Sequence, residues 1–146
     1  MLFRSGGAVL GTLRPDKAVA SDVLRPLVAL WQAVQQRPDE VAGWYAERWH
    51  ACETDKVANY VKIRASYNAA PNPADLLFLA RACYGGVIRF RNDGGMNTPC
   101  GIHRPIAPAD FETRLRDWHQ RVRGVEFRHA DFAEMLAAAQ PGDVVY

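Results

Sequence analysis

Apolar positions recur every three or four residues over long stretches of the chain, a spacing that predicts helices with one buried face. The first stretch follows Asp22. A second helix is expected after Pro38, and a third from a Thr54 or Asp55 cap to about Asn68. The face after Asp22 is formed by Leu24, Leu27, Val28, Trp31 and Val34.

A fourth helix is predicted from Asn72, a residue type that caps helices, with Pro73 at the first helical position and Asp75 at the positive end. This helix is apolar nearly all round from Leu76 to Ala80. We therefore expect it to be buried between neighbouring helices.

Strand patterns lie on both sides of these helices. "MLFRSGGAVL" predicts a strand, a tight turn and a helix, and "KAVASD" predicts a short strand that ends at Asp22. Further on, "PADFETRLRDWHQRVRG" predicts a helix stopped by Gly124, "VEFRH" a strand, "ADFAEMLAAAQ" a helix from about Asp131, and "GDVVY" a buried strand. The chain thus has the pattern of an α/β domain with a helical insertion.

Composition sets limits on this picture. With 146 residues, 49% of them hydrophobic, the chain is long enough for one compact domain with a core. The formal net charge of +2 is too small to indicate a chain that is basic throughout, so a basic surface would be local. No run approaches the ~18 apolar residues of a membrane span and no signal peptide is seen, which favours a cytoplasmic protein without a membrane partner. Three cysteines without C-x-x-C spacing fit reduced thiols.

Two short features suggest a nucleotide-like ligand. Gly6 and Gly7 stand where a strand would turn into a helix, so a ligand could approach the backbone there. Asp22, at the end of the next strand, could accept hydrogen bonds from ribose hydroxyls. The alternatives are an ordinary turn at the glycines and a helix N-cap at Asp22.

Taken together, "F-x-x-G-G-A-V", "SD", "RASYN", "ADLLFLARACYGGVIRFRNDGGMNTPCG", "ADF" and "GDVVY" resemble the Dam-like class of DNA adenine-N6 methyltransferases. The resemblance covers essentially the whole chain. It implies a Rossmann-like S-adenosylmethionine domain that carries an inserted helical DNA-recognition domain and a β-hairpin loop. Its most specific positions are Gly86, Arg89, Phe90, Gly94, Asn97, Pro99 and Gly101.

The same resemblance implies cofactor-binding roles. Phe3, Gly6 and Gly7 correspond to the glycine loop beside the methionine part of S-adenosylmethionine, and Asp22 corresponds to the acid that binds its ribose. Asp131 and Phe132 correspond to the pair beside its adenine ring. The competing interpretations are plain core packing for the two phenylalanines and a helix N-cap for Asp131.

In this class an Asp-Pro-Pro-Tyr motif follows a "VVY"-like strand, and the sequence stops at Tyr146. We therefore expect a segment that is catalytically incompetent by itself, and we assign no catalytic residue. The histidines are interpreted as surface or helix residues. Cys100 and His103 make only a C-x-x-H pair, fewer ligands than the four usual for zinc, so no metal site is assigned.

The arginine-bearing loop is the candidate DNA-binding surface. Between Arg81 and Arg104 there are four arginines and one acidic residue, Asp93. We expect Arg89 to bind guanine bidentately and Arg91 to bind a phosphate or a neighbouring base, while Asn97 fixes the turns of the loop. The full set of predicted DNA-binding residues is Arg81, Arg89, Arg91 and Arg104. The alternative is a solvated arginine-rich loop packed on the helices.

The predicted division is residues 1–36 for the first part of the catalytic domain, 37–107 for the DNA-recognition insertion and 108–146 for the continuation of the catalytic domain. The favoured function is site-specific DNA adenine-N6 methylation of duplex DNA with S-adenosylmethionine, as a host or phage enzyme or beside a cognate restriction endonuclease. A non-catalytic DNA-binding module and another nucleotide-binding α/β enzyme are the alternatives.

Overall fold

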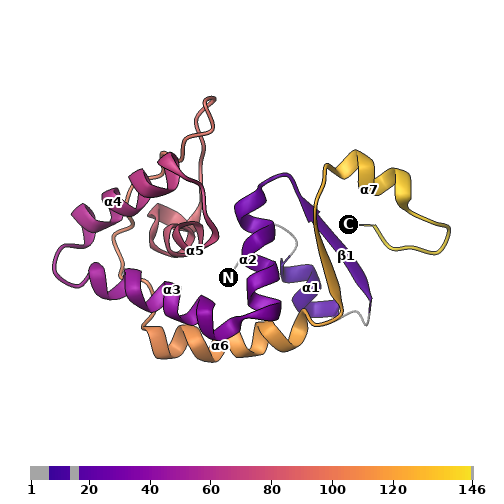
Figure 1. Cartoon of the computed structure of the whole chain (residues 1–146), viewed down its shortest axis with the longest axis horizontal. Helices are drawn as coiled ribbons and strands as arrows, with labels where there is room; N and C mark the ends of the chain where they lie inside the picture. Colours follow the sequence, from indigo (N-terminus) through magenta and orange to yellow (C-terminus); the bar gives the residue numbers. More distant parts are fainter. Residues whose placement is uncertain (1–6, 14–16, 146) are drawn as a thin grey trace.

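The computed structural model describes residues 7–13 and 17–145. Figure 1 shows α3, α4 and α5 on the left, a pair of strands right of centre with α7 beyond them, and α6 running along the bottom from beneath α3 to the foot of the strand pair. The elements are α1 (Gly7–Leu13), β1 (Ala18–Asp22), α2 (Arg25–Gln36), α3 (Pro38–Ala51), α4 (Lys56–Ala69), α5 (Pro73–Ala82), a short 3-10 turn η1 (Tyr84–Gly86), α6 (Pro108–Arg121), β2 (Val125–His129) and α7 (Phe132–Ala138).

The two strands are parallel and in register, from Ala18 opposite Val125 to Asp22 opposite His129. Helix α2 covers this pair, because Trp31 stacks on Phe127 with ring centroids 5.5 Å apart and planes 2° from parallel. The fold is therefore α/β with a small parallel sheet, and the predicted strands that end at Asp22 and His129 are confirmed.

The outer edge of β2 is closed by two glutamines of α2. The Gln32 amide donates to the Phe127 carbonyl at 2.9 Å, and the Gln35 amide donates to the Val125 carbonyl at 2.8 Å and to the Val122 carbonyl at 2.7 Å. Alternate carbonyls of a strand point to the same side, so these bonds occupy the side of β2 that faces away from β1. Such covering protects an edge strand from pairing with another chain.

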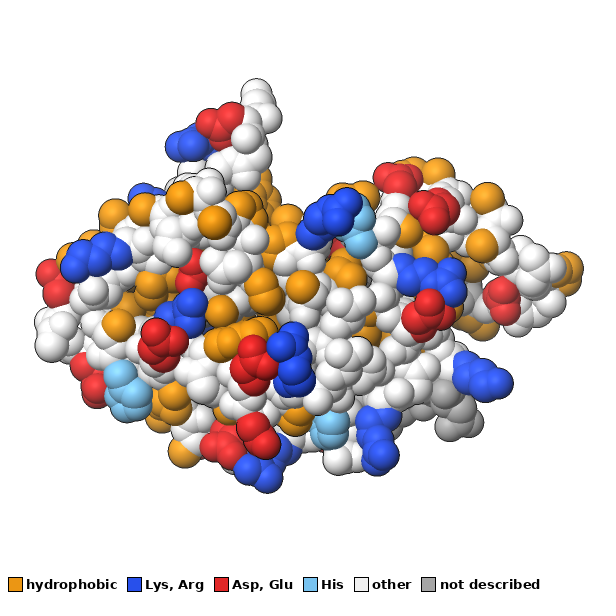
Figure 2. Space-filling view, in the orientation of Figure 1, with side chains coloured by type: hydrophobic (Ala, Val, Ile, Leu, Met, Phe, Trp, Pro, Cys, Tyr) orange, Lys and Arg blue, Asp and Glu red, His pale blue; other side chains and the backbone are white. Residues whose placement is uncertain are grey.

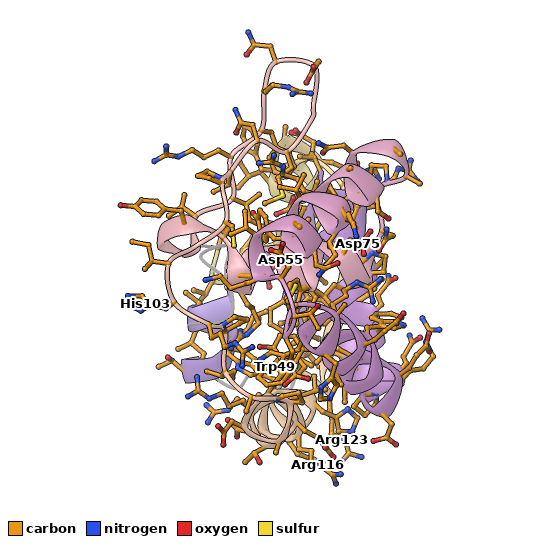
Figure 3. The ribbon with its side chains drawn as sticks, turned by 90° about the vertical axis from the view of Figure 1, so that its left-hand side faces the viewer. Trp49, Asp55, Asp75, His103, Arg116 and Arg123 are labelled. Carbon is orange, nitrogen blue, oxygen red and sulfur yellow. The ribbon has the colours of Figure 1, made fainter. Side chains whose placement is uncertain are left out.

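The predicted helices of the central region are confirmed, together with their caps. The Asp55 carboxylate accepts from the Ala58 amide, and the Asn72 side chain accepts from the Asp75 amide. Helix α5 is buried along most of its length, as its all-round apolar sequence predicts. Asp75 is 2% exposed and binds the Arg48 guanidinium at 2.7 Å, and Figure 3 shows it inside the helical layer.

The segment between α5 and α6 reverses direction and projects from the body as a narrow loop, at the top of Figure 1. Its two arms meet at two isolated antiparallel bridges, Cys83 with Cys100 and Phe90 with Met96, and form no regular strands. Its turns contain Gly85, Gly86 and Gly94, which have positive φ angles in the left-handed region. Residues with a side chain are disfavoured in this region. We call residues 83–103 the arginine hairpin.

Two details of the predicted fold are wrong within the described residues. Residues 142–145 form no buried strand, and Val144 is 90% exposed. A turn held by Asp143 and Gln140 precedes them, and they pair with neither β1 nor β2. Helix α6 ends at Arg121 with Val122 as its C-cap, before Gly124. The strand predicted around Phe3 lies outside the described residues.

None of the helices in the described part of the chain is both long and apolar enough to cross a bilayer.

Candidate functional site

Two acidic side chains that are far apart in the sequence lie at the same end of the parallel strand pair. Asp22 is the last residue of β1 and is in register with His129, and Asp131 follows two residues later. Ligands of open α/β sheets bind outside the carboxyl ends of the strands. The register therefore brings both predicted cofactor acids to this end of the strand pair.

Each of these carboxylates makes one local hydrogen bond. The Leu24 amide donates to Asp22 Oδ1 at 2.8 Å, and the Ala133 amide donates to Asp131 Oδ1 at 2.9 Å. The cap predicted as an alternative for Asp131 is thus present. An ionised carboxylate has two oxygens and about four acceptor sites, so a cap does not prevent a second donor from binding. Both carboxylates can therefore still accept hydrogen bonds from hydroxyl or amine donors.

Phe132 is 72% exposed beside Asp131. The alternative interpretation of this residue, plain core packing, is therefore wrong, and an aromatic ring is available for an apolar ligand surface. Of the predicted glycine loop, Phe3 and Gly6 lie outside the described residues, and Gly7 is the first residue of α1.

Arg89 and Arg91 lie on the first arm of the arginine hairpin, and both are exposed. Arg91 Nε is 3.1 Å from the carboxylate of Asp93 at the tip of the loop. Figure 2 shows this tip standing clear of the body, with basic and acidic side chains near its end. An exposed arginine on a narrow projection has the shape needed to reach into a groove of a duplex.

The other two predicted arginines are packed against aromatic rings. Arg81 is half-buried, with its guanidinium carbon 5.3 Å from the ring centroid of Phe111, and burial lowers its pKa. Arg104 lies 5.2 Å from the ring centroid of Trp49 and donates to the Glu53 carbonyl at 3.3 Å. These contacts give both residues a structural role, and their DNA-binding roles stay predictions.

Helix α4 contributes residues that the sequence analysis did not single out. The returning arm of the arginine hairpin is the part from residue 96 to 102. Its backbone accepts hydrogen bonds from the side chains of Lys56, Tyr60, Arg64 and Asn68. The signal in the sequence was their exact four-residue spacing, which places them in one row along a helix. Tyr60 is fully buried, and burial raises the pKa of its phenol strongly, so it stays a protonated donor.

An apolar groove of about 490 Å³ separates the arginine hairpin from the start of α2. Leu24 and Ala29 line one side, and Tyr67 and Phe90 line the other. Leu24 follows Asp22 by two residues, so the hairpin and the acidic end of the strand pair both border the region at the beginning of α2.

The described residues contain no cluster of three or more histidine, cysteine or acidic side chains arranged to hold a metal ion. His103 points away from the body in Figure 3. Burial raises the pKa of the Cys52, Cys83 and Cys100 thiols, which keeps them protonated and poorly nucleophilic.

Known proteins resemble the chain along its whole length. The family described as D12 class N6 adenine-specific DNA methyltransferase matches residues 2–146. Proteins named DNA adenine methylase from Salmonella typhi and from Escherichia coli (strain K12) are each 26% identical to the chain over 149 residues, and one from Vibrio cholerae is 24% identical.

These alignments cover 99% of the chain and 52% of each relative, so the chain spans about half the length of the relatives it matches. The family match includes both the acidic end of the strand pair and the arginine hairpin. The chain belongs to the D12 class of N6 adenine-specific DNA methyltransferases.

Proposed function

We propose that the protein carrying this chain transfers a methyl group from S-adenosylmethionine to the N6 atom of adenine at a specific sequence in duplex DNA. One observation carries the proposal: two acidic residues at the carboxyl ends of parallel strands and an exposed arginine hairpin occur together in a chain of this family. Another nucleotide-binding α/β enzyme would have no use for the hairpin.

The proposed cofactor-binding residues are those predicted from the sequence. Asp22 would accept from the ribose hydroxyls, and Asp131 from the exocyclic amine of the cofactor's adenine, with Phe132 against the ring. Phe3, Gly6 and Gly7 would lie beside the methionine part. S-adenosylmethionine supplies an electrophilic methyl group. The residues of this chain would bind and orient it, and none of them is assigned a catalytic role.

The arginine hairpin would read the DNA. Arg89 can present two parallel N–H donors to guanine, and Arg91, Arg81 and Arg104 are proposed for phosphates or neighbouring bases. In this proposal residues 37–107 form the inserted recognition domain of a Rossmann-like fold, between catalytic parts at 1–36 and 108–146. A cytoplasmic location and a companion restriction endonuclease belong to the same proposal.

The test is direct transfer of label. The complete gene product is incubated with S-adenosylmethionine labelled in its methyl group and with a long duplex DNA, and the digested nucleosides are separated. We expect label in N6-methyladenine, and none when single-stranded DNA replaces the duplex. Sequence-specific binding without label would instead identify a DNA-binding module. Label in another base would contradict the proposal.

A further inference from the structure

The returning arm of the arginine hairpin, residues 96–102, lacks a continuous partner strand. Apart from the two isolated bridges to the first arm, the described residues place no strand beside it. Backbone groups need partners when they are withdrawn from water. In this arm many of those partners are side chains of α4.

The row on α4 meets the arm from end to end. Lys56 Nζ donates to the carbonyls of Gly101 and Ile102, both at 2.7 Å. The Tyr60 hydroxyl and the Arg64 guanidinium donate to the Thr98 carbonyl at 2.9 and 3.0 Å.

Asn68 completes the row with two bonds to one residue. Its amide donates to the Met96 carbonyl at 3.0 Å, and its Oδ1 accepts from the Met96 amide at 2.8 Å. The Asn68 side chain therefore satisfies both backbone groups of Met96, as a neighbouring strand would.

Thr98 and Met96 connect the returning arm to the backbone at Arg89. The buried Thr98 hydroxyl accepts from the Arg89 amide at 2.7 Å and donates to the Val87 carbonyl at 3.1 Å. Met96 is bridged to Phe90, the residue after Arg89, and its own side chain is buried. The backbone of Arg89 is thus connected to α4 through Thr98 and through Met96, although the side chains of the α4 row form no hydrogen bond to Arg89 itself.

We infer that the α4 row, Lys56, Tyr60, Arg64 and Asn68, consists of positioning residues that set the height and register at which Arg89 meets a base pair. This inference rests on the proposed function. Readout of a base edge needs a preorganised donor, because a displaced guanidinium cannot make both bonds to guanine. On this basis α4 determines specificity without contacting DNA through this row.

Asn68→Ala tests the inference in the complete gene product. Alanine removes both bonds to Met96, suits a helix and leaves every arginine in place. A duplex library with about ten randomised base pairs is selected once for binding, and sequencing gives the preference at each position. A single wrong base pair changes affinity by roughly five- to hundredfold. At the base pair where Arg89→Ala abolishes the preference, we therefore expect Asn68→Ala to lower that preference about tenfold.

Three further readouts separate positioning from plain destabilisation. The salt dependence of total binding should not change, because no phosphate-neutralising charge is lost. Adding Asn68→Ala to Arg89→Ala should cause no further loss of preference, because the first acts through the second. The amides of Met96 and Arg89 should exchange hydrogen faster, and Asn68→Asp, which keeps the acceptor, should protect the Met96 amide.

Asn59→Ala is the matched control. Asn59 lies on the same helix, and its amide donates to the Asp55 carbonyl of its own turn. This variant should keep the wild-type preference.

An Asn68→Ala variant with the wild-type preference would overturn the inference and leave the proposed function standing. The inference would also be overturned if Asn68→Ala lowered the sequence preference equally in the wild-type protein and in the Arg89→Ala variant. If the wild-type protein enriches no sequence at all, the proposed function falls, and the inference falls with it.

Discussion

Asp22 has two neighbours that define its environment: the Leu24 amide, which donates to it, and His129, which lies opposite it in the sheet. The local bond fixes the carboxylate at the end of β1 before any ligand arrives. A preorganised acceptor binds a hydroxyl donor without a further cost of ordering its own side chain.

Replacing this carboxylate by an amide tests its proposed role. Asp22→Asn keeps an acceptor for the Leu24 amide and removes the charge, so it should weaken cofactor binding by about 1–2 kcal/mol, because hydrogen bonds to charged groups are the stronger ones. Calorimetric titration of the complete gene product with S-adenosylhomocysteine measures the change. Asp110→Asn, in an exposed position of α6, is the control. Equal affinities for the wild type and Asp22→Asn would remove Asp22 from the site.

At the scale of elements, α2 both packs on the core and covers the edge of β2. Its apolar periodicity predicts only the first of these roles. Its apolar face packs on the core through residues such as Leu30 and Trp31, and its glutamines close the edge of β2. Amide side chains that bind strand carbonyls leave no template for another chain on that side. Further strands of the sheet would therefore have to pair beside β1.

Gln35→Ala tests this edge protection. It leaves the Val122 and Val125 carbonyls without their side-chain donor, so we expect a loss of about 1 kcal/mol in the free energy of unfolding. Urea unfolding gives the value, and light scattering reports any new association through the uncovered edge. Gln36→Ala, at the next position of α2, where the side chain is exposed, should change neither quantity. A Gln35→Ala protein as stable as the control would show that water replaces the amide at no cost.

Elements whose signals are local were predictable, and elements that need a distant partner were not. The Asp55 and Asn72 caps and the apolar faces lie within their own helices, so the sequence contains the information for α2 to α5. "VVY" has strand composition, yet Val144 and Val145 are exposed, because a strand forms only against another strand. The role of Lys56, Tyr60, Arg64 and Asn68 could not be predicted for the same reason, because their partners are distant in the sequence. Lys56 and Gly101, for example, are 45 residues apart.

For the candidate site, the sequence named the residues but did not predict what surrounds them. The resemblance assigned Asp22 and Asp131 together, and the register of β1 and β2 brings them to one end of the sheet. Periodicity does not reveal that Arg81 packs on Phe111, or that Thr98 supplies the side chain that holds Arg89. Such contacts depend on tertiary packing, which short-range patterns do not encode.

At the scale of the whole molecule, the buried side chains form one continuous cluster from Leu27 to Phe127. Helix α2 lies in the first predicted segment, yet it packs against α5 of the second as well as against β2 and α6 of the third. The proposed division at residues 36 and 107 therefore crosses a shared core.

Because of this shared core, the chain should unfold as one unit. Unfolding in urea followed by far-ultraviolet circular dichroism, which reports the helices, and by tryptophan fluorescence should give coincident transitions. Trp31 lies against β2 and Trp49 near the end of α3, so the fluorescence samples both ends of the core. Two separated transitions would show that the predicted segments are energetically independent.

The tip of the arginine hairpin is held differently from its arms. The hydrogen bonds recorded for Arg91, Asp93, Gly94 and Gly95 connect these residues to one another, whereas the arm behind them is fastened to α4. Mutations in the tip thus alter the surface offered to a partner while the requirements of folding remain met. Under the proposed function, new target preferences can therefore arise in a lineage through a few substitutions, while the scaffold is inherited intact.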